Sequence, residues 1–128
     1  MLCLKEMNPN QFSQFLEHSI VSYAEEMSIA RDIGLEEAKA DSTKQFQELL
    51  PQGLETEDNH LFMIQKESEN IGHLWFAEKH KTKKPQAYIY DIELSEAFRG
   101  KGLGAEAMEL FENKAKEMGI SELALHVF

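Results

Sequence analysis

The stretch "RGKGLGAEAMELF", residues 99–111, places three glycines within five positions and then continues as a run of helix-forming residues. Gly100, Gly102 and Gly104 give the backbone access to positive φ angles and remove the Cβ atoms that would block a close approach. The residues from Ala105 to Phe111 are all acceptable or good helix formers. We therefore expect a glycine-rich turn that leads directly into a helix, at a point where something comes close to the backbone.

A strand, a glycine-rich turn and the start of a helix together form an anion site, and phosphate is its natural ligand. Two common phosphate motifs do not fit here. The chain contains no GxxxxGK[ST] P-loop. Gly100, Gly102 and Ala105 satisfy the G-x-G-x-x-A pattern of dinucleotide-binding folds, but "SEAFR" separates them from the preceding strand. That fold also needs an acidic residue at the end of the next strand, and Glu122 would stand at its beginning.

The N-terminal half of the chain predicts one strand and two helices. "LCLKEM" is typical of a short strand, and Asn8 followed by Pro9 indicates an N-cap and a first helical residue. Apolar residues at spacings of three and four extend this helix to about Gly34. A second helix is predicted over residues 35–50. Its expected inward-facing residues are Leu35, Ala38, Phe46 and Leu49.

The C-terminal half changes to a strand pattern. "HLFMIQKE" and "IGHLWFAEKH" predict two antiparallel strands joined by a tight turn, and "AYIYDIEL", residues 87–94, predicts a third. A helix over about residues 103–118 should end at Gly119, and "ELALHVF" predicts a last strand. The order is β-α-α-β-β-β-α-β. The expected class is α/β (α+β mixed), a mixed twisted sheet with helices on both faces and a parallel, right-handed last βαβ unit.

Composition narrows the possible partners. The chain has 128 residues, which suits a single domain over 1–128, and a net charge of −10, which argues against binding to nucleic acid or an anionic membrane. It shows neither a membrane span nor a signal peptide, so we expect a cytoplasmic protein. Cys3 is alone and is expected as a small apolar residue of the first strand. The basic run "KHKTKK", residues 79–84, is expected at a solvated hairpin tip.

The segment "IELSEAFRGKGLGAEAM" resembles the acyl-CoA signature of the GNAT superfamily of N-acyltransferases. The family core, R/Q-x-x-G-x-G/A, is met by Arg99, Gly102 and Gly104, with an apolar Leu94 five residues before the arginine and an aromatic Phe98 just before it. A proline is frequent where Glu96 stands. The predicted elements also follow the family's order over nearly the whole chain. The resemblance therefore implies the GNAT-like acyl-CoA N-acyltransferase fold and an acyltransferase activity.

By this resemblance, acetyl-CoA is the cosubstrate, and backbone N–H groups from Arg99 to Gly104 hold its pyrophosphate. The N–H of Leu94 would donate to the thioester carbonyl, where the motif strand separates from the next strand. Arg99 is otherwise a surface arginine, and Lys101 either contacts phosphate or is solvated. The implied cofactor-binding residues are Ile92, Leu94, Arg99, Gly100, Lys101, Gly102, Leu103 and Gly104.

A catalytic base is expected on the strand that precedes the loop. Asp91 and Glu93 are the carboxylates within reach, and strict alternation places them on one face with Ile89, and Tyr88 and Tyr90 on the other. A carboxylate on a central strand is costly unless it is paired or used. Asp91 is favoured as a direct or water-relayed base and Glu93 follows. The alternative is that both are surface carboxylates.

Other candidate residues are weaker. His60, His73 and His126 lie on separate predicted strands without the spacing of metal ligands, so structural roles and no metal are expected. Trp75 and Tyr23 either line an acceptor pocket or belong to the core.

The resulting hypothesis is an N-acetyltransferase that moves an acetyl group from acetyl-CoA to a primary amine by direct transfer in a ternary complex. The acceptor is a small-molecule or protein amine. Two alternatives stay open: a non-catalytic acyl-CoA-binding regulatory module, and a fragment that folds only with a partner or as a homodimer. The family usually continues with a further helix, which often bears a tyrosine acid, and a last strand pair. We therefore expect a C-terminally truncated domain, with no general acid assigned.

Overall fold

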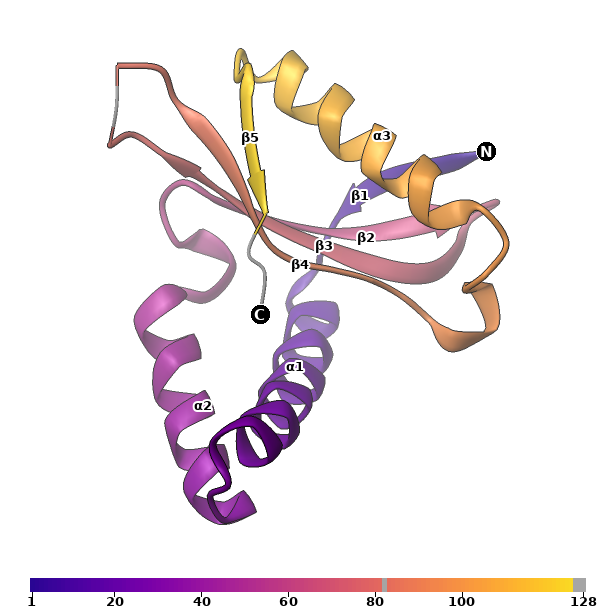
Figure 1. Ribbon diagram of the computed structural model, residues 1–128. Coiled ribbons are helices and arrows are strands. Elements are labelled where there is room, and N and C mark those ends of the chain that lie inside the picture. Colours follow the sequence, from indigo (N-terminus) through magenta and orange to yellow (C-terminus); the bar gives the residue numbers. More distant parts are fainter. Residues whose placement is uncertain (82, 126–128) are drawn as a thin grey trace. The chain divides into compact units, whose positions relative to one another are not determined.

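The computed structural model describes residues 1–81 and 83–125 of the chain. The elements follow the predicted order, with a five-stranded sheet in the order β1-β2-β3-β4-β5 (Figure 1). The first three strand pairs are antiparallel, and β4 and β5 are parallel. This confirms the α/β class and the mixed sheet. Contacts group the chain into two compact units, residues 8–56 and residues 1–7 with 57–128, which are described in turn.

The first unit is a helical hairpin. Helix α1 (Pro9–Arg31) begins with a capping box, in which the Asn8 side chain accepts from the Gln11 N–H at 2.8 Å and the Gln11 side chain accepts from the Asn8 N–H at 3.0 Å. It ends at Arg31, three residues before the predicted end, because Asp32 adopts the left-handed conformation with φ 52°. The short 3-10 helix η1 (Gly53–Glu55) follows the second helix of the hairpin.

Helix α2 (Leu35–Leu49) packs against α1 within this unit. Ala38 and Phe46 are buried as predicted, but Leu35 is 42% exposed, so its predicted inward position is wrong. Ser42 of α2 is buried, although it is polar. Its hydroxyl donates to the Ile20 carbonyl of α1 at 2.8 Å, so its hydrogen bond is satisfied within the helix pair.

The second unit is the sheet with one helix. Strand β1 (Leu2–Glu6) pairs with β2 (Asn59–Lys66), which pairs with β3 (Glu69–Lys79) through a two-residue turn. Both turn residues, Glu67 and Ser68, have positive φ, as a tight hairpin turn between right-twisted strands requires. Strand β4 (Gln86–Leu94) follows the basic run "KHKTKK", which joins β3 to β4 as predicted.

After β4, the 3-10 helix η2 (Glu96–Phe98) leads into α3 (Leu103–Glu117) and then β5 (Glu122–Leu125). The last predicted strand is confirmed over these four residues, and its remainder, including His126, lies outside the described residues. Helix α3 packs on one face of the sheet, where Phe111 meets Phe76 edge-on at 5.2 Å between ring centroids. The buried core between α3 and the sheet consists of Leu2, Phe62, Ile64, Ile71, Leu74, Phe76, Ala87, Ile89, Leu94, Ala107, Phe111, Ala115 and Ile120.

Strand β4 contains a β-bulge at Tyr90. Phe76 of β3 pairs with Ile89, but the next residue, Trp75, pairs with Asp91, so Tyr90 is an extra residue on β4. Directly opposed residues of antiparallel strands share a face. Each residue of β4 after the bulge therefore lies on the face opposite to the one that strict alternation would give it.

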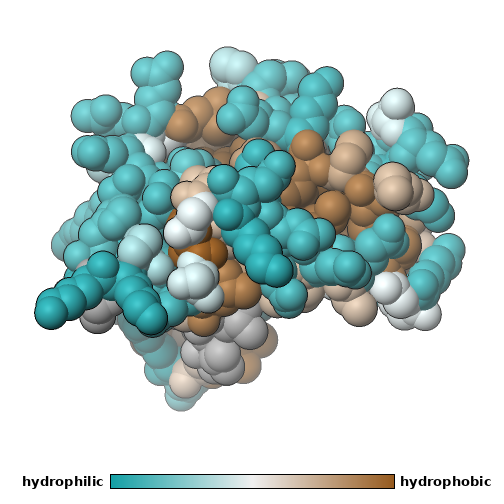
Figure 2. All heavy atoms as spheres, turned by 90° about the horizontal axis from the view of Figure 1, so that it is seen from above, coloured by the Kyte–Doolittle hydropathy of each residue, from teal (hydrophilic) through white to brown (hydrophobic). Residues whose placement is uncertain are grey.

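The surface of the protein agrees with its acidic composition. In the space-filling view from above, hydrophilic side chains cover much of the visible face, with apolar side chains showing between them (Figure 2). Among the described residues, no helix combines the length and apolar character that a membrane span needs. Cys3 lies on β1 as predicted, but its side chain is exposed, because alternate residues of this edge strand point away from the core.

Candidate functional site

The glycine-rich turn leads directly into α3, as predicted. Gly100 and Gly102 have φ angles of 74° and 77°, which other residues rarely adopt. Gly102 is the N-cap of α3 and offers no side chain to the first helical N–H groups. Gly104 lies in the first turn, and a Cβ built on it would meet no atom within 4 Å. The start of α3 therefore presents uncapped N–H donors beside open space, which is the arrangement that holds an anion.

Arg99 clamps the end of β4. Its Nε donates to the Leu94 carbonyl at 2.9 Å, and its Nη2 donates to Glu93 Oε1 at 3.1 Å. From the sequence, Arg99 was interpreted either as part of the phosphate site or as an ordinary surface arginine. In the structure it ties the glycine turn to the strand that carries the predicted base. Lys101 lies with its Nζ 5.9 Å from the centroid of the Phe98 ring.

The backbone N–H groups at the end of β4 point to two different edges. The Ser95 N–H donates to the Ile71 carbonyl of β3 at 2.7 Å. Because successive N–H groups of a strand alternate in direction, those of Ile92 and Leu94 point to the opposite edge, toward the β5 side. The described pairing of β4 with β5 ends at Ile89 and Leu125. The N–H groups of Ile92 and Leu94 thus lie beyond the last described pair of this ladder.

Asp91 and Glu93 lie on the face opposite Ile89, so their predicted placement with Ile89 is wrong. The cause is the bulge at Tyr90, which places Asp91 opposite Trp75 and Glu93 opposite His73. The prediction that the two carboxylates share a face is confirmed, but Tyr88, opposite Ala77, lies on that same face. Ile92 instead packs with the core on the α3 face.

His73 brings the two carboxylates into one cluster. Its Nε2 lies 3.0 Å from Asp91 Oδ2 and 4.0 Å from Glu93 Oε2. The side chains of His73, Asp91 and Glu93 are 12%, 27% and 35% exposed, so all three are partly buried. Of the two carboxylate oxygens of Asp91, Oδ2 has a hydrogen-bond partner among the described residues, whereas Oδ1 has none there and is left open. The histidine was expected to be structural, and the structure adds a contact to the favoured base.

Aromatic side chains line the same face of β3 and β4. Trp75 stacks on Tyr90 at 4.6 Å between centroids, and Tyr88 meets Tyr90 edge-on at 5.0 Å. The Lys79 ammonium lies 4.9 Å from the Tyr90 centroid. Trp75 is only 2% exposed and donates to the Asn59 side chain at 2.9 Å, so it belongs to the packed part of this face. Its role in an acceptor pocket stays a prediction.

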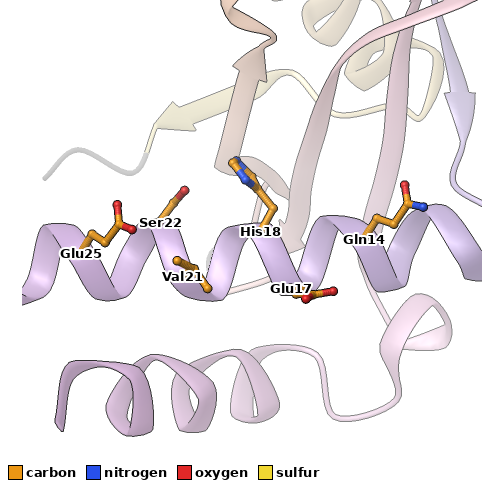
Figure 3. Close-up of a pocket in the computed structure, with 6 residues that line it drawn as sticks. All are labelled: Gln14, Glu17, His18, Val21, Ser22 and Glu25. Carbon is orange, nitrogen blue, oxygen red and sulfur yellow. The ribbon is translucent and has the colours of Figure 1, made fainter. Parts of the chain in front are cut away.

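Two further features lie on the helical unit. Tyr23, the other predicted pocket residue, packs edge-on against Phe46 of α2. A separate hollow runs along α1 and is lined by residues that no sequence motif singled out: Gln14, Glu17, His18, Val21, Ser22 and Glu25 (Figure 3). All six come from one helix, and they form no cluster of convergent donors.

The mixed sheet, with a glycine-rich turn that leads from β4 into α3, has the architecture expected of the acyl-CoA N-acyltransferase fold. The sequence profile of the acetyltransferase (GNAT) family matches residues 22–128, and the chain belongs to this family. It is 36% identical to the uncharacterized N-acetyltransferase YycN of Bacillus subtilis over 128 residues, covering 99% of this chain and 82% of YycN. The structural alignment with the crystal structure of YycN covers 100% of this chain and 82% of the YycN chain, with a TM-score of 0.93.

Two other comparisons agree with this assignment. The uncharacterized N-acetyltransferase YdgE of Bacillus subtilis is 30% identical over 126 residues, which cover 98% of this chain and 80% of YdgE. A predicted acetyltransferase from Clostridium acetobutylicum, whose crystal structure was solved with acetyl-CoA, shares the fold with a TM-score of 0.60 and 17% sequence identity. The alignment covers 99% of this chain and 81% of the Clostridium chain. The GNAT fold and an acetyltransferase class are therefore established for this chain.

Proposed function

We propose that the protein transfers an acetyl group from acetyl-CoA to a primary amine by direct transfer in a ternary complex. The observation that carries this proposal is the junction of β4, the glycine turn and α3. There, uncapped helix N–H groups and the outward N–H groups of Ile92 and Leu94 lie along one continuous stretch of backbone. The acetyl-CoA bound to the Clostridium acetobutylicum protein of the same fold supports the choice of donor.

The glycine turn fits a pyrophosphate. Backbone N–H groups from Arg99 to Gly104, with Lys101 beside them, would hold its oxygens through hydrogen bonds and the positive end of the α3 dipole. The open space at the Cβ position of Gly104 is where a side chain would obstruct the phosphate. Leu103, the first residue of α3, belongs to the same cradle.

Acetyl-CoA, when bound, supplies an acetyl thioester, and the chain's own groups would act on the thioester carbonyl and on the acceptor amine. The N–H of Leu94, with that of Ile92 nearby, would donate to the carbonyl oxygen on which negative charge develops. The Leu94 carbonyl accepts from Arg99 at 2.9 Å, which fixes the peptide group that ends β4. As the acceptor nitrogen bonds to the carbonyl carbon, the carbon–sulfur bond breaks and the thiolate leaves.

Asp91 is the proposed base, because an amine acceptor must lose a proton to become a nucleophile. Its open oxygen would take that proton directly or through one water, while His73 holds the other oxygen at 3.0 Å and fixes the carboxylate. Glu93 is already engaged at Oε1 by Arg99, so it suits electrostatic attraction of a cationic amine better than proton transfer. The acceptor itself remains a small-molecule or protein amine.

The test is thioester turnover by the purified chain with a panel of amines: a polyamine, an aminoglycoside, an amino acid and a peptide with a free amine. Release of free thiol is measured with and without each amine. We expect turnover with at least one amine, and Asp91→Asn should lower kcat/KM by about 100-fold. The exposed Glu109→Gln on α3 is a matched control. Binding of acetyl-CoA without turnover across the panel would contradict the proposal and favour a non-catalytic acyl-CoA-binding module.

A further inference from the structure

Two short segments of similar sequence meet at one end of the β2–β3 ladder. "DNH", residues 58–60, leads into β2, and "EKH", residues 78–80, leads out of β3. Each is a carboxylate, one spacer residue and a histidine. Glu78 and His60 lie on the two strands, whereas Asp58, with φ 60°, and His80 lie in the loops next to them. The Glu78 N–H donates to the Asp58 carbonyl at 2.8 Å, which holds the two segments side by side.

The side chains converge on one another. Nε2 of His80 lies 3.8 Å from Asp58 Oδ2 and 4.0 Å from Glu78 Oε1, and one ligand atom from each of the three lies within 4.8 Å of the others. These separations are too long for hydrogen bonds. They are close to the edge of about 3.4 Å that three ligands make around a tetrahedral zinc ion with bonds of about 2.1 Å. Small side-chain rotations would close the remaining difference.

The charges of the cluster favour a cation. Asp58 and Glu78 place two carboxylates close together, and among the described residues neither pairs with a lysine or an arginine. His60 contacts the second oxygen of Glu78, with Nε2 2.8 Å from Oε2. A histidine that contacts a ligating carboxylate in this way orients it, as outer-shell partners of metal sites do.

The other histidine–carboxylate cluster of the sheet differs on these points. His73 already lies 3.0 Å from Asp91, and Arg99 donates to Glu93 at 3.1 Å. That cluster thus has a short internal contact and a permanent cation. Among the described residues, the cluster of Asp58, Glu78 and His80 has no lysine or arginine, and its one short contact comes from His60, 2.8 Å from Glu78. Its side chains are 42%, 21% and 54% exposed and so are accessible to an ion.

We propose that Asp58, Glu78 and His80 bind a Zn²⁺ ion, with His60 as the residue that orients Glu78. One imidazole nitrogen and two carboxylate oxygens are ligands that zinc accepts, and water would complete the tetrahedron. The site lies at the opposite end of the antiparallel β3–β4 pair from the glycine turn, so the ion takes no part in acetyl transfer. It joins the start of β2 to the end of β3, beside the hairpin that leads to β4.

The experiment is isothermal titration of ZnCl2 into the untagged, chelator-treated chain that carries Cys3→Ser, so that the lone thiol cannot contribute. We expect one Zn²⁺ per chain and a rise in the thermal midpoint on binding. His80→Gln and Glu78→Gln should each raise Kd at least tenfold, and His60→Gln should raise it about tenfold as an outer-shell change. MgCl2, which prefers all-oxygen sites, should bind more weakly.

His73→Gln is the matched control, because it removes the same side chain from the other cluster. We expect it to leave the Zn²⁺ affinity unchanged. The proposal is overturned if the chain does not bind Zn²⁺, if His80→Gln and Glu78→Gln bind it as tightly as the parent, or if His73→Gln abolishes binding. Asp58→Asn, at an exposed position before β2, provides an independent third variant should either of the first two fail to fold.

Discussion

Gly72→Ala is a sharp test of how closely β3 approaches the functional end of β4. Gly72 stands opposite Leu94, and a Cβ built on it would lie 2.2 Å from the Glu93 carbonyl oxygen. It would also lie 3.0 Å from the Leu94 Cα and 3.1 Å from its Cδ2. Two of these three atoms are backbone, so the conflict cannot be relieved by turning a side chain. We expect the two strands to separate at this point.

The size of the effect follows from the displacement needed. An ordinary carbon–oxygen contact of about 3.2 Å requires β4 to move by about 1 Å. That movement would stretch the neighbouring bond from the Ser95 N–H to the Ile71 carbonyl, now 2.7 Å, beyond hydrogen-bond range. Overpacking of this kind costs about 1–3 kcal/mol. For a chain of this length, that lowers the thermal midpoint by about 4–12 °C.

Trp75 makes the measurement direct. It is the single tryptophan of the chain, lies three residues from Gly72 on β3 and is 2% exposed, so its fluorescence reports unfolding of the sheet unit. Gly104→Ala is the matched control, because its Cβ meets nothing within 4 Å and it lies in a helical turn, where alanine is favoured. A Gly72→Ala protein that melts within about 2 °C of the parent, with unchanged tryptophan emission, would refute this reasoning.

The remaining predictions concern three separate parts of the molecule. Gly104→Val should weaken CoA binding at least tenfold, about 1.4 kcal/mol, with unchanged circular dichroism, and an unaltered Kd by titration would remove the glycine turn as the phosphate site. Phe111→Ala should lower the unfolding free energy by about 3–5 kcal/mol in urea, since Phe111 is 1% exposed and contacts Phe76; a loss below about 1 kcal/mol would argue against this core. Asn8→Ala should lower the stability of the helical hairpin by about 1 kcal/mol, because the Gln11 N–H loses its hydrogen-bond acceptor. Denaturant unfolding followed by the helical circular dichroism signal measures this, and unchanged stability would show that the cap is dispensable.

Local patterns predicted most of the fold. The N-cap at Asn8, the tight turn after Lys66 and the glycine turn before α3 each depend on a few neighbouring residues, and the structure has all three. The turn at Gly102 could be predicted because glycine is the residue type that adopts a φ of 77° at the lowest cost. Burial was harder to predict where a polar residue replaced an apolar one, as with Ser42, because its hydrogen bond to Ile20 depends on the partner helix.

The predicted site was incomplete because its decisive contacts are between strands. Alternation alone cannot reveal an extra residue in a ladder, so the face of Asp91 was assigned wrongly until the pairing with β3 was known. The same shift brings His73 beside Asp91, although they are 18 positions apart in the chain. The clamp by Arg99 likewise depends on how its long side chain turns back to Leu94.

The extra residue at position 90 has a consequence for how the strand could be rebuilt. Deletion of Tyr90 would put Trp75 and Phe76 opposite consecutive residues of β4, so the ladder would become regular. Asp91 and Glu93 would keep their present face, and Ile92 would stay in the core. The bulge is therefore separable from the inside–outside pattern of the strand: a shortened chain would keep Asp91, Glu93 and Ile92 on their present faces while losing the bulge and the Tyr90 ring that stacks on Trp75.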